Sequence, residues 1–443
     1  MFPVSQARPR TSGGFARGAA YAGAMSINDE RHEPALWQVL VTAFLPTAIY
    51  SIGQGAIVPV IPSIAAGLGA SEAVAGFIAG SLLIGHAIGN LPASAVVQRF
   101  GERRAMIFSA LATVVGALIS VTAVNEWMLL VGILIQGMMT ATFALARQSF
   151  LTTYVPFRYR ARAMSSLGGV FRSGMFIGPF LAAWLIALTG SPQVNFWAFI
   201  VCSFLVVVSL LILPDIEKYA RPEQPHAGSP TGPRPSLWSV IRDRREVLLR
   251  LGLAAGTMMA LRTARQVVLP LWGHSIGLDP ATISIIVGVG GAIDFALFFT
   301  SGWIMDKFGR AASAVPALVG MGIGFIALAF LRDVPNAHLW FALIVAWIAL
   351  SNGVGSGIVM TLGSDLADPG RPAAFLGAWR TITDTSSATV PFVVTGVIAL
   401  AGLPATAAVF GVAGLLGAGM FARYIPRYVP KPPKTGPIDL SSD

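Results

Sequence analysis

The sequence predicts an all-α membrane protein in which twelve transmembrane helices form two pseudo-symmetric six-helix bundles. Three observations support this fold class. Hydrophobic residues make up 55% of the 443 residues and charged residues only 11%, whereas soluble domains contain about 25% charged residues. Apolar runs long enough to cross a bilayer as helices, about 20 residues each, recur about twelve times. The second half of the chain also repeats the first.

The internal repeat has a fixed offset of 208 residues, as between Gly101 and Gly309. The segment 302–310, Gly-Trp-Ile-Met-Asp-Lys-Phe-Gly-Arg, resembles the segment 94–102, Ser-Ala-Val-Val-Gln-Arg-Phe-Gly-Glu. The same offset pairs four further positions: Pro62 with Pro270, Arg172 with Arg380, His86 with Asp294, and Gln54 with Arg262. Two copies of one membrane unit around a central path are typical of secondary transporters. Transport is therefore the leading functional hypothesis.

The chain is expected to consist of six spans, a linker and six more spans. The apolar runs lie near residues 38–64, 73–97, 105–123, 127–151, 163–188, 195–213, 248–272, 281–304, 311–331, 338–360, 373–399 and 404–424. The expected domains are a disordered cytoplasmic N-terminus (1–36), an N-terminal bundle (37–213), a cytoplasmic linker (214–247), a C-terminal bundle (248–425) and a cytoplasmic tail (426–443). The linker is rich in proline, which predicts flexibility. Met25 resembles an ordinary start, so residues 1–24 are expected to be dispensable.

The formal net charge of +10 indicates membrane topology rather than nucleic-acid binding. The basic residues gather in alternate loops: Arg99, Arg103, Arg104, Arg158, Arg160, Arg162, Lys307, Arg310 and Arg371, with more in the linker. The opposite loops contribute a single cation, Arg332. By the positive-inside rule, both termini and the linker are cytoplasmic. We expect a protein integral to the plasma membrane, such as a bacterial inner membrane, with the lipid bilayer rather than nucleic acid as its partner.

Ionisable side chains within the apolar runs are the main candidates for function, because each costs about 2.5–3.5 kcal/mol near a bilayer centre. They are Arg172, Arg262, Arg265, Arg380, Asp294 and Asp384, together with His86. The excess of arginine favours an anionic or zwitterionic substrate. Two other interpretations remain open. The charges could pair internally and only orient helices, and Arg262 and Arg265 could extend to the membrane interface.

The segment Gly302-x-x-x-Asp306-Lys307-x-Gly309-Arg310 resembles a loop motif of the major facilitator superfamily, and the resemblance covers nearly all of residues 37–425. It implies the major facilitator fold and a monomer. It also implies a conformational latch, in which acid and basic groups at helix ends pair differently in two states. The candidate latch residues are Gly302, Asp306, Lys307, Gly309, Arg310, Arg99 and Gly101. The first copy has Gln98 for the acid and Glu102 for the base, so its latch is expected to be weaker or rewired.

Three further motifs resemble the twelve-span drug:proton antiporter branch of that superfamily. They are Pro59-Val-Ile-Pro62 in the first span, Gln136-Gly137 in the fourth, and Gly174-x-x-x-Gly178-Pro179 in the fifth. The last motif is associated with export, although small residues four apart also let any two membrane helices pack closely. Ile133 stands where that branch has an arginine tied to proton coupling. Coupling is therefore expected to use other groups.

The resemblance also implies that span two packs on span eleven, and span five on span eight. Arg172 is then expected near Asp294, and His86 near Arg380 and Asp384. Asp294 is the leading candidate for the proton carrier, since a carboxylate can exchange a proton as its surroundings change. His86 and Asp384 are the other proton-coupling candidates.

Span seven is placed on the central cavity by the same resemblance. The substrate-binding candidates are Arg262, Arg265, Gln266, Gln54, Arg172 and Arg380. The favoured function is proton-coupled efflux of small organic molecules by alternating access, and the alternative is uptake of an organic anion by proton symport. An intramembrane enzyme or a sensor is disfavoured. His86, Asp294 and Asp384 are the only metal-type ligands within the predicted spans, and their arginine neighbours oppose the binding of a cation. The sequence has no Gly-Lys-Ser/Thr phosphate loop, so ATP is not expected to drive transport. No cofactor or metal is expected.

Overall fold

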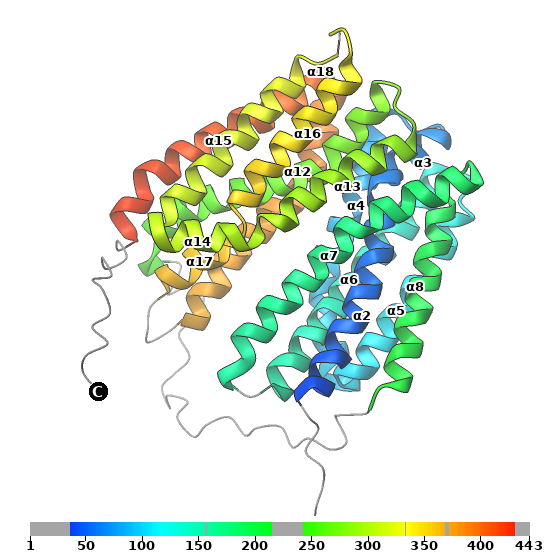
Figure 1. Ribbon diagram of the computed structural model, residues 1–443, viewed down its shortest axis with the longest axis horizontal. Helices are drawn as coiled ribbons and strands as arrows, with labels where there is room; N and C mark the ends of the chain where they lie inside the picture. The colour runs from blue at the N-terminus through cyan, green and yellow to red at the C-terminus, as the bar shows by residue number, and fades with distance from the viewer. Residues whose placement is uncertain (1–35, 156, 215–241, 333, 368–371, 430–443) are drawn as a thin grey trace, which may run out of the picture.

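The computed structural model describes residues 36–155, 157–214, 242–332, 334–367 and 372–429 (Figure 1). The expectations for a disordered N-terminus, for most of the linker and for the end of the tail lie outside these described residues. They remain predictions.

The first half of the chain forms helices close to the six predicted spans. These helices are α2 (Leu36–Ile57), η1 (Val58–Val60), α3 (Ile61–Gly67), α4 (Glu72–Phe100), α5 (Glu102–Val121), α6 (Glu126–Tyr154), α7 (Phe157–Thr189) and α8 (Val194–Ile212). The first span is broken at η1, where Pro59 and Pro62 lack the N–H groups that a continuous helix needs. Ser71 and Asn125 cap α4 and α6 by accepting hydrogen bonds from the backbone N–H groups of Val74 and Met128.

The second half contains more broken helices than the first. Its helices are α11 (Arg245–Val247), η2 (Leu248–Gly252), α12 (Leu253–Ser275), α13 (Pro280–Ala296), α14 (Phe298–Phe308), α15 (Arg310–Ala329), α16 (Ala337–Val354), α17 (Ile358–Leu366) and α18 (Pro372–Tyr428). Among the described residues, 10 helices are long and apolar enough to cross a membrane, and α13 with α14 forms an eleventh, bent by 44°. Helix α18 is two helices that meet at Gly402, where the backbone is not helical (φ 83°). When α18 is counted as two spans that meet at Gly402, the described residues contain the twelve spans that the sequence predicts.

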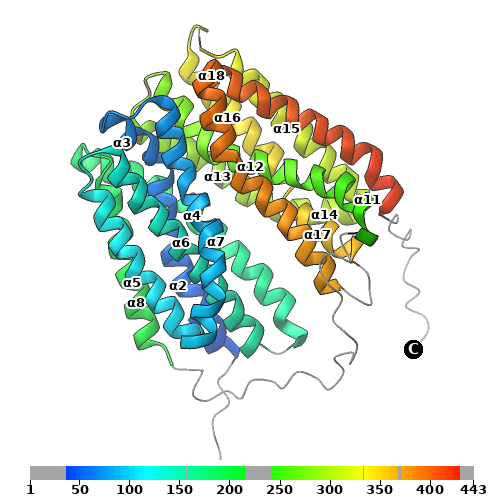
Figure 2. The same cartoon turned by 180° about the vertical axis from the view of Figure 1, so that it is seen from behind.

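The two halves of the chain form two bundles that lie side by side (Figures 1 and 2). Helices α4 and α18 pack together across the boundary, with the rings of Phe77 and Phe392 5.9 Å apart. Helices α7 and α13 form the matching pair, with the rings of Phe176 and Phe295 5.2 Å apart. The predicted packing of span two on eleven and of span five on eight is therefore confirmed.

The internal repeat extends to the backbone conformation. Gly101 has φ 82° and ψ 165° between α4 and α5, and Gly309 has φ 89° and ψ 167° between α14 and α15. Gly69 and Gly277, which share the same offset, also have positive φ, 91° and 80°. Residues with a Cβ rarely adopt positive φ. The glycines of the repeat are thus required by the turns that they form.

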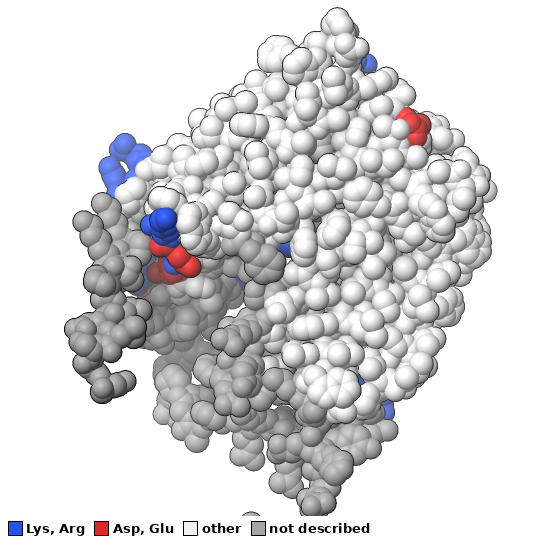
Figure 3. All heavy atoms as spheres, viewed as in Figure 1, with Lys and Arg blue, Asp and Glu red and all other residues white. Residues whose placement is uncertain are grey.

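The outer surface of the bundles is apolar. Large hydrophobic side chains are widely exposed on the helices, such as Trp184 (60%), Leu188 (65%) and Ile212 (78%). The face seen in Figure 3 carries few charged side chains over either bundle. A surface of this kind is stable in hydrocarbon and not in water, so the chain is an integral membrane protein.

The glycine motif of α7 lies against α2. A Cβ added at Gly178 would lie 2.5 Å from the amide nitrogen of Ala56 and from the carbonyl oxygen of Ile52, both of which are backbone atoms that move little. Gly168, on the same helix, has nothing within 4 Å of the equivalent position.

We therefore expect Gly178→Ala to lower the free energy of unfolding by about 1–3 kcal/mol. Gly168→Ala is the matched control and should leave stability unchanged or raise it by up to about 1 kcal/mol, the helix propensity of alanine over glycine. Thermal unfolding in detergent measures both variants. Equal melting temperatures for the two would show that α2 and α7 are not packed this closely.

Candidate functional site

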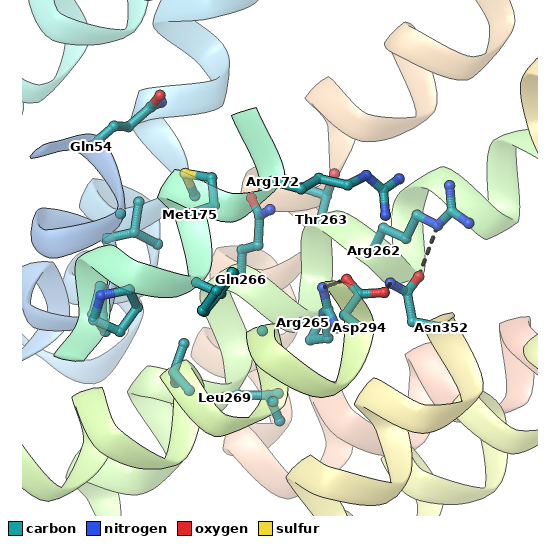
Figure 4. A pocket seen from close by; sticks show the side chains of 18 of the residues that line it. Gln54, Arg172, Met175, Arg262, Thr263, Arg265, Gln266, Leu269, Asp294 and Asn352 are labelled. Atoms are coloured by element: carbon teal, nitrogen blue, oxygen red, sulfur yellow. Dashed lines mark hydrogen bonds and ion pairs between the residues drawn. The ribbon is translucent and has the colours of Figure 1, made fainter. Parts of the chain in front are cut away.

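The site is a cavity of about 560 Å³ between the two bundles. The first half contributes side chains from α2, α4, α6 and α7, and the second half from α12, α13, α16 and α18. The polar or charged lining residues are Gln54, His86, Thr140, Arg172, Arg262, Thr263, Arg265, Gln266, Asp294, Asn352, Asp384 and Ser387. In Figure 4 the charged side chains gather on one side of this cavity, and Gln54 lies apart from them.

Asp294 on α13 is the centre of the charged group. Its Oδ2 accepts a hydrogen bond from Nη2 of Arg265 at 3.0 Å, and its Oδ1 accepts one from Nδ2 of Asn352 at 2.7 Å. The two charged side chains are mostly buried, with Arg265 18% and Asp294 14% exposed. Both carboxylate oxygens are therefore engaged, and the negative charge is compensated by a direct ion pair.

Arg262 extends this network along α12. Its Nε donates to Oδ1 of Asn352 at 2.9 Å, and its Nη2 donates to the carbonyl oxygen of Gly355 at 2.7 Å. Arg262 and Arg265 thus line the cavity and bond to its walls, so the interpretation that they extend to the membrane interface is wrong.

The carbonyl that Arg262 binds belongs to a break in the tenth span. Helix α16 ends at Val354, and Gly357 has a left-handed conformation (φ 80°) before α17 begins. Buried carbonyl oxygens at such a break need donors. Ser313 Oγ donates to the oxygen of Val354 and Ser301 Oγ to that of Ser356, each at 2.6 Å. The charged network and the helix break are therefore one hydrogen-bonded unit.

Arg172 reaches this unit from the other bundle. Its Nη1 donates to Oγ of Ser356 at 2.9 Å, and its guanidinium lies over the ring of Phe298 at 4.8 Å. Arg172 acts on Asp294 electrostatically, but the ion-pair partner of Asp294 is Arg265. The predicted pairing of Arg172 with Asp294 is corrected in this respect. Arg265 and Asp294 belong to the same bundle and pair directly. Arg172 belongs to the other bundle and instead binds Ser356 at the break in the tenth span.

Of the remaining proton-coupling and substrate-binding candidates, all but Arg380 line the cavity. His86 and Asp384 both line the cavity, whereas Arg380 is exposed and does not line it. The expected grouping of His86 with Arg380 and Asp384 is therefore met only in part, since His86 and Asp384 line one cavity and Arg380 does not. Arg147 also lies within electrostatic range of His86. Gln266 faces the cavity, and the buried Oε1 of Gln54 has no hydrogen-bond partner among the described residues.

Arg147 on α6 was not a candidate from the sequence. Its guanidinium lies 4.9 Å from the ring of Phe171 and 5.7 Å from that of Phe143. Its Nε and Nη1 are buried without a hydrogen-bond partner in the described residues. Cation–π contacts contribute about 2 kcal/mol when desolvated, but a buried donor without an acceptor costs about 1–3 kcal/mol. The position of Arg147 inside the predicted span 127–151 was the signal that could have identified it.

The candidate latch residues of the second motif copy lie where α14 meets α15. Arg310 donates through Nε to Oδ2 of Asp365 at 2.8 Å and through Nη1 to Oδ1 of Asp306 at 3.1 Å. Asp306 is 81% exposed and Asp365 only 27%, so Asp365 on α17 is the more buried partner, which the motif does not include. Lys307 stacks on Trp303 at 4.8 Å instead of joining the ion pairs.

The first copy of the motif makes different contacts. Glu102, which stands in place of the base, accepts hydrogen bonds from the hydroxyl groups of Ser149 at 2.9 Å and Thr153 at 3.3 Å. Arg99 lies over the ring of Phe100 at 5.7 Å. This end of the first bundle therefore connects α5 to α6 through neutral partners.

Comparison with known proteins gives one family. The family model described as Major Facilitator Superfamily matches residues 43–391. The chain is 24% identical over 361 residues to the class G tetracycline resistance protein of Vibrio anguillarum, a match that covers 79% of this chain and 88% of the relative. It is 28% identical over 293 residues to the riboflavin transporter RfnT of Brucella anthropi, covering 63% of this chain and 69% of the relative.

The solved structures agree on the fold. A crystal structure of the peptide transporter POT in complex with sulfate superposes with a TM-score of 0.71 at 14% identity, covering 88% of this chain and 95% of that one. At this identity the likeness concerns the arrangement of helices alone.

Proposed function

The chain belongs to the major facilitator superfamily of membrane transporters, which are not enzymes, and we propose that it exports small organic molecules in exchange for protons. The observation that supports this most is Asp294, a buried carboxylate that lines the cavity between the bundles. Export is supported by the Gly174, Gly178 and Pro179 motif on α7 and by the likeness to a tetracycline resistance protein. We further propose a monomer in the bacterial inner membrane with both termini in the cytoplasm.

Asp294 is the proposed proton carrier. A proton on the carboxylate removes its charge, and the ion pair with Arg265 is then lost. In an antiporter, substrate and proton must compete for one state of the protein. A substrate that carries a cationic and an anionic group meets this condition. Its cationic group would bind the unprotonated carboxylate of Asp294, and its anionic group would bind Arg262 and Arg265. The proposed substrate class is therefore zwitterionic or of mixed charge.

A second candidate function follows from the charge of the same cluster. Arg172, Arg262 and Arg265 against Asp294 give a formal charge of +2, and protonation of Asp294 would raise it to +3. A purely anionic substrate would bind more tightly to the protonated cluster by Coulomb attraction. Proton and anion would then travel together, which is the requirement for uptake by symport.

The two functions predict opposite effects of pH on binding, because the coupling of two ligands is reciprocal. Binding of tetracycline, as the mixed-charge probe, and of benzoate, as the anionic probe, is measured on purified protein in detergent as the pH is lowered. Exchange predicts that tetracycline binds more weakly as Asp294 takes up a proton. Symport predicts that benzoate binds more tightly. Affinities that do not change with pH for either probe would contradict a role for Asp294 in both functions.

A further inference from the structure

We propose that Arg147, which lies behind Phe171 in the wall of the cavity, is a further anion-binding residue and holds the carboxylate of a transported molecule on the side of the first bundle. This proposal rests on the proposed function only in that the cavity carries organic molecules with an anionic group. Arg147 lies in the fourth span, and none of the sequence motifs includes it.

The first argument is the unused hydrogen-bonding capacity of its guanidinium. Nε and Nη1 of Arg147 are buried and have no acceptor among the described residues. The cavity arginines of the charged cluster are all bonded, as Arg265 is to Asp294, Arg262 to Asn352 and Arg172 to Ser356. A guanidinium binds the two oxygens of a carboxylate along its Nε–Nη2 edge or along its Nη1–Nη2 edge, and each of these edges includes one of the two unpaired groups of Arg147. Arg147 therefore presents a binding group that the protein leaves open.

The second argument is the absence of an internal counter-ion. Tyr50, whose ring stacks on that of Phe143 at 4.4 Å, carries no charge at neutral pH, and its hydroxyl is already shared with Thr113 and Thr140. Glu102, near the same end of α6, is bound by the hydroxyl groups of Ser149 and Thr153. The described part of the first bundle thus provides no carboxylate for Arg147.

The third argument is the position of Arg147 behind the cavity wall. Phe171 lines the cavity, and its ring also covers the guanidinium at 4.9 Å. A change of the Phe171 rotamer would open the guanidinium to the cavity. His86 lines the cavity within electrostatic range of Arg147 and offers a ring N–H as a further donor. A carboxylate held there would contact the first bundle instead of Arg262 and Arg265, while the cationic group of the same molecule would reach Asp294 in the second bundle.

Chemical modification of the wild-type protein tests this without any substitution. Phenylglyoxal reacts with accessible arginine side chains, and mass spectrometry quantifies each product. We expect Arg147 to react more slowly than a surface arginine, since Phe171 must first uncover it, and we expect benzoate, but not the neutral benzamide, to protect it. Arg423, exposed at the end of α18, is the internal control and should react equally in all samples. A failure of Arg147 to react, or a reaction that benzoate does not slow, would overturn the proposal.

A matched pair of variants gives a second test by affinity. Arg147→Gln should raise the Kd for benzoate about tenfold or more, because it removes a charge-assisted contact. Arg147→Lys should recover part of the loss, and Arg423→Gln should bind like wild type. A Kd for Arg147→Gln equal to that of wild type would restrict Arg147 to packing between the two phenylalanine rings. Neither test requires proton flux, so proton-coupled transport without protection refutes this inference alone, and protection without coupled transport refutes the proposed function alone.

Discussion

Replacement of Asp294 by asparagine is expected to abolish the coupling of substrate movement to protons while the protein still folds and exchanges substrate. Asparagine has no proton to exchange, yet its carbonyl oxygen can still accept a hydrogen bond from Arg265 or Asn352. In reconstituted vesicles, accumulation driven by a pH gradient should fall to the level of protein-free vesicles. Exchange of labelled for unlabelled substrate without a gradient should persist, but at higher substrate concentrations, because the variant also loses the charge that binds the cationic group of the substrate.

Asp279→Asn is the matched control for that variant. Asp279 caps the start of the same helix, α13, by accepting hydrogen bonds from Ala281 and Thr282, and asparagine caps equally well. Partial burial tends to raise the pKa of Asp279, but hydrogen bonds from Thr282 and Ala281 outweigh it and hold that pKa below its usual value. This control should couple like wild type. Gradient-driven accumulation that survives in Asp294→Asn would remove Asp294 from the proton path.

The second large effect is expected from Arg265. Arg265→Gln leaves the mostly buried carboxylate of Asp294 without its ion-pair partner, and breaking a buried pair in this way costs about 3–5 kcal/mol. Addition of Asp294→Asn to Arg265→Gln should restore much of that stability, because no unpaired charge then remains. Thermal unfolding of the two single variants and the double variant gives the coupling energy.

The same cycle distinguishes the two arginines near Asp294. Arg172 donates to Ser356 and not directly to the carboxylate, so Arg172→Gln combined with Asp294→Asn should show a much smaller coupling energy. Equal coupling energies for Arg172 and Arg265 would contradict the ion-pair assignment. They would support the pairing that the sequence alone had predicted.

The fold was predictable because two strong signals agree. Apolar runs of membrane-spanning length fix the number of helices, and the offset of 208 residues between Gly101 and Gly309 indicates two similar halves. The glycine turns had a direct physical basis, since both need positive φ. The break in the tenth span was also visible in part, because Gly353, Gly355 and Gly357 alternate along five residues.

The site was less predictable because the rotation of each helix about its axis is not encoded in hydropathy. The sequence predicts that Asp294 lies near Arg172 across the bundles, but the rotation of α12 places Arg265 in direct contact with Asp294. Arg380 is a substrate-binding candidate from the sequence, but the structure leaves its side chain exposed and outside the cavity lining. Arg147 was overlooked because it lies near the end of an apolar run. Asp365 was overlooked because its partner Arg310 is distant in sequence.

Proton flux in wild-type proteoliposomes tests the central claim most directly. The vesicles contain a pH dye, and tetracycline or another compound of mixed charge is supplied on one side as a gradient without an imposed pH difference. The account predicts proton movement opposite to the compound, dependent on its presence and on Asp294. Proton movement in the same direction as an anionic compound would establish symport instead. Transport of the compound with no accompanying proton movement would contradict proton coupling.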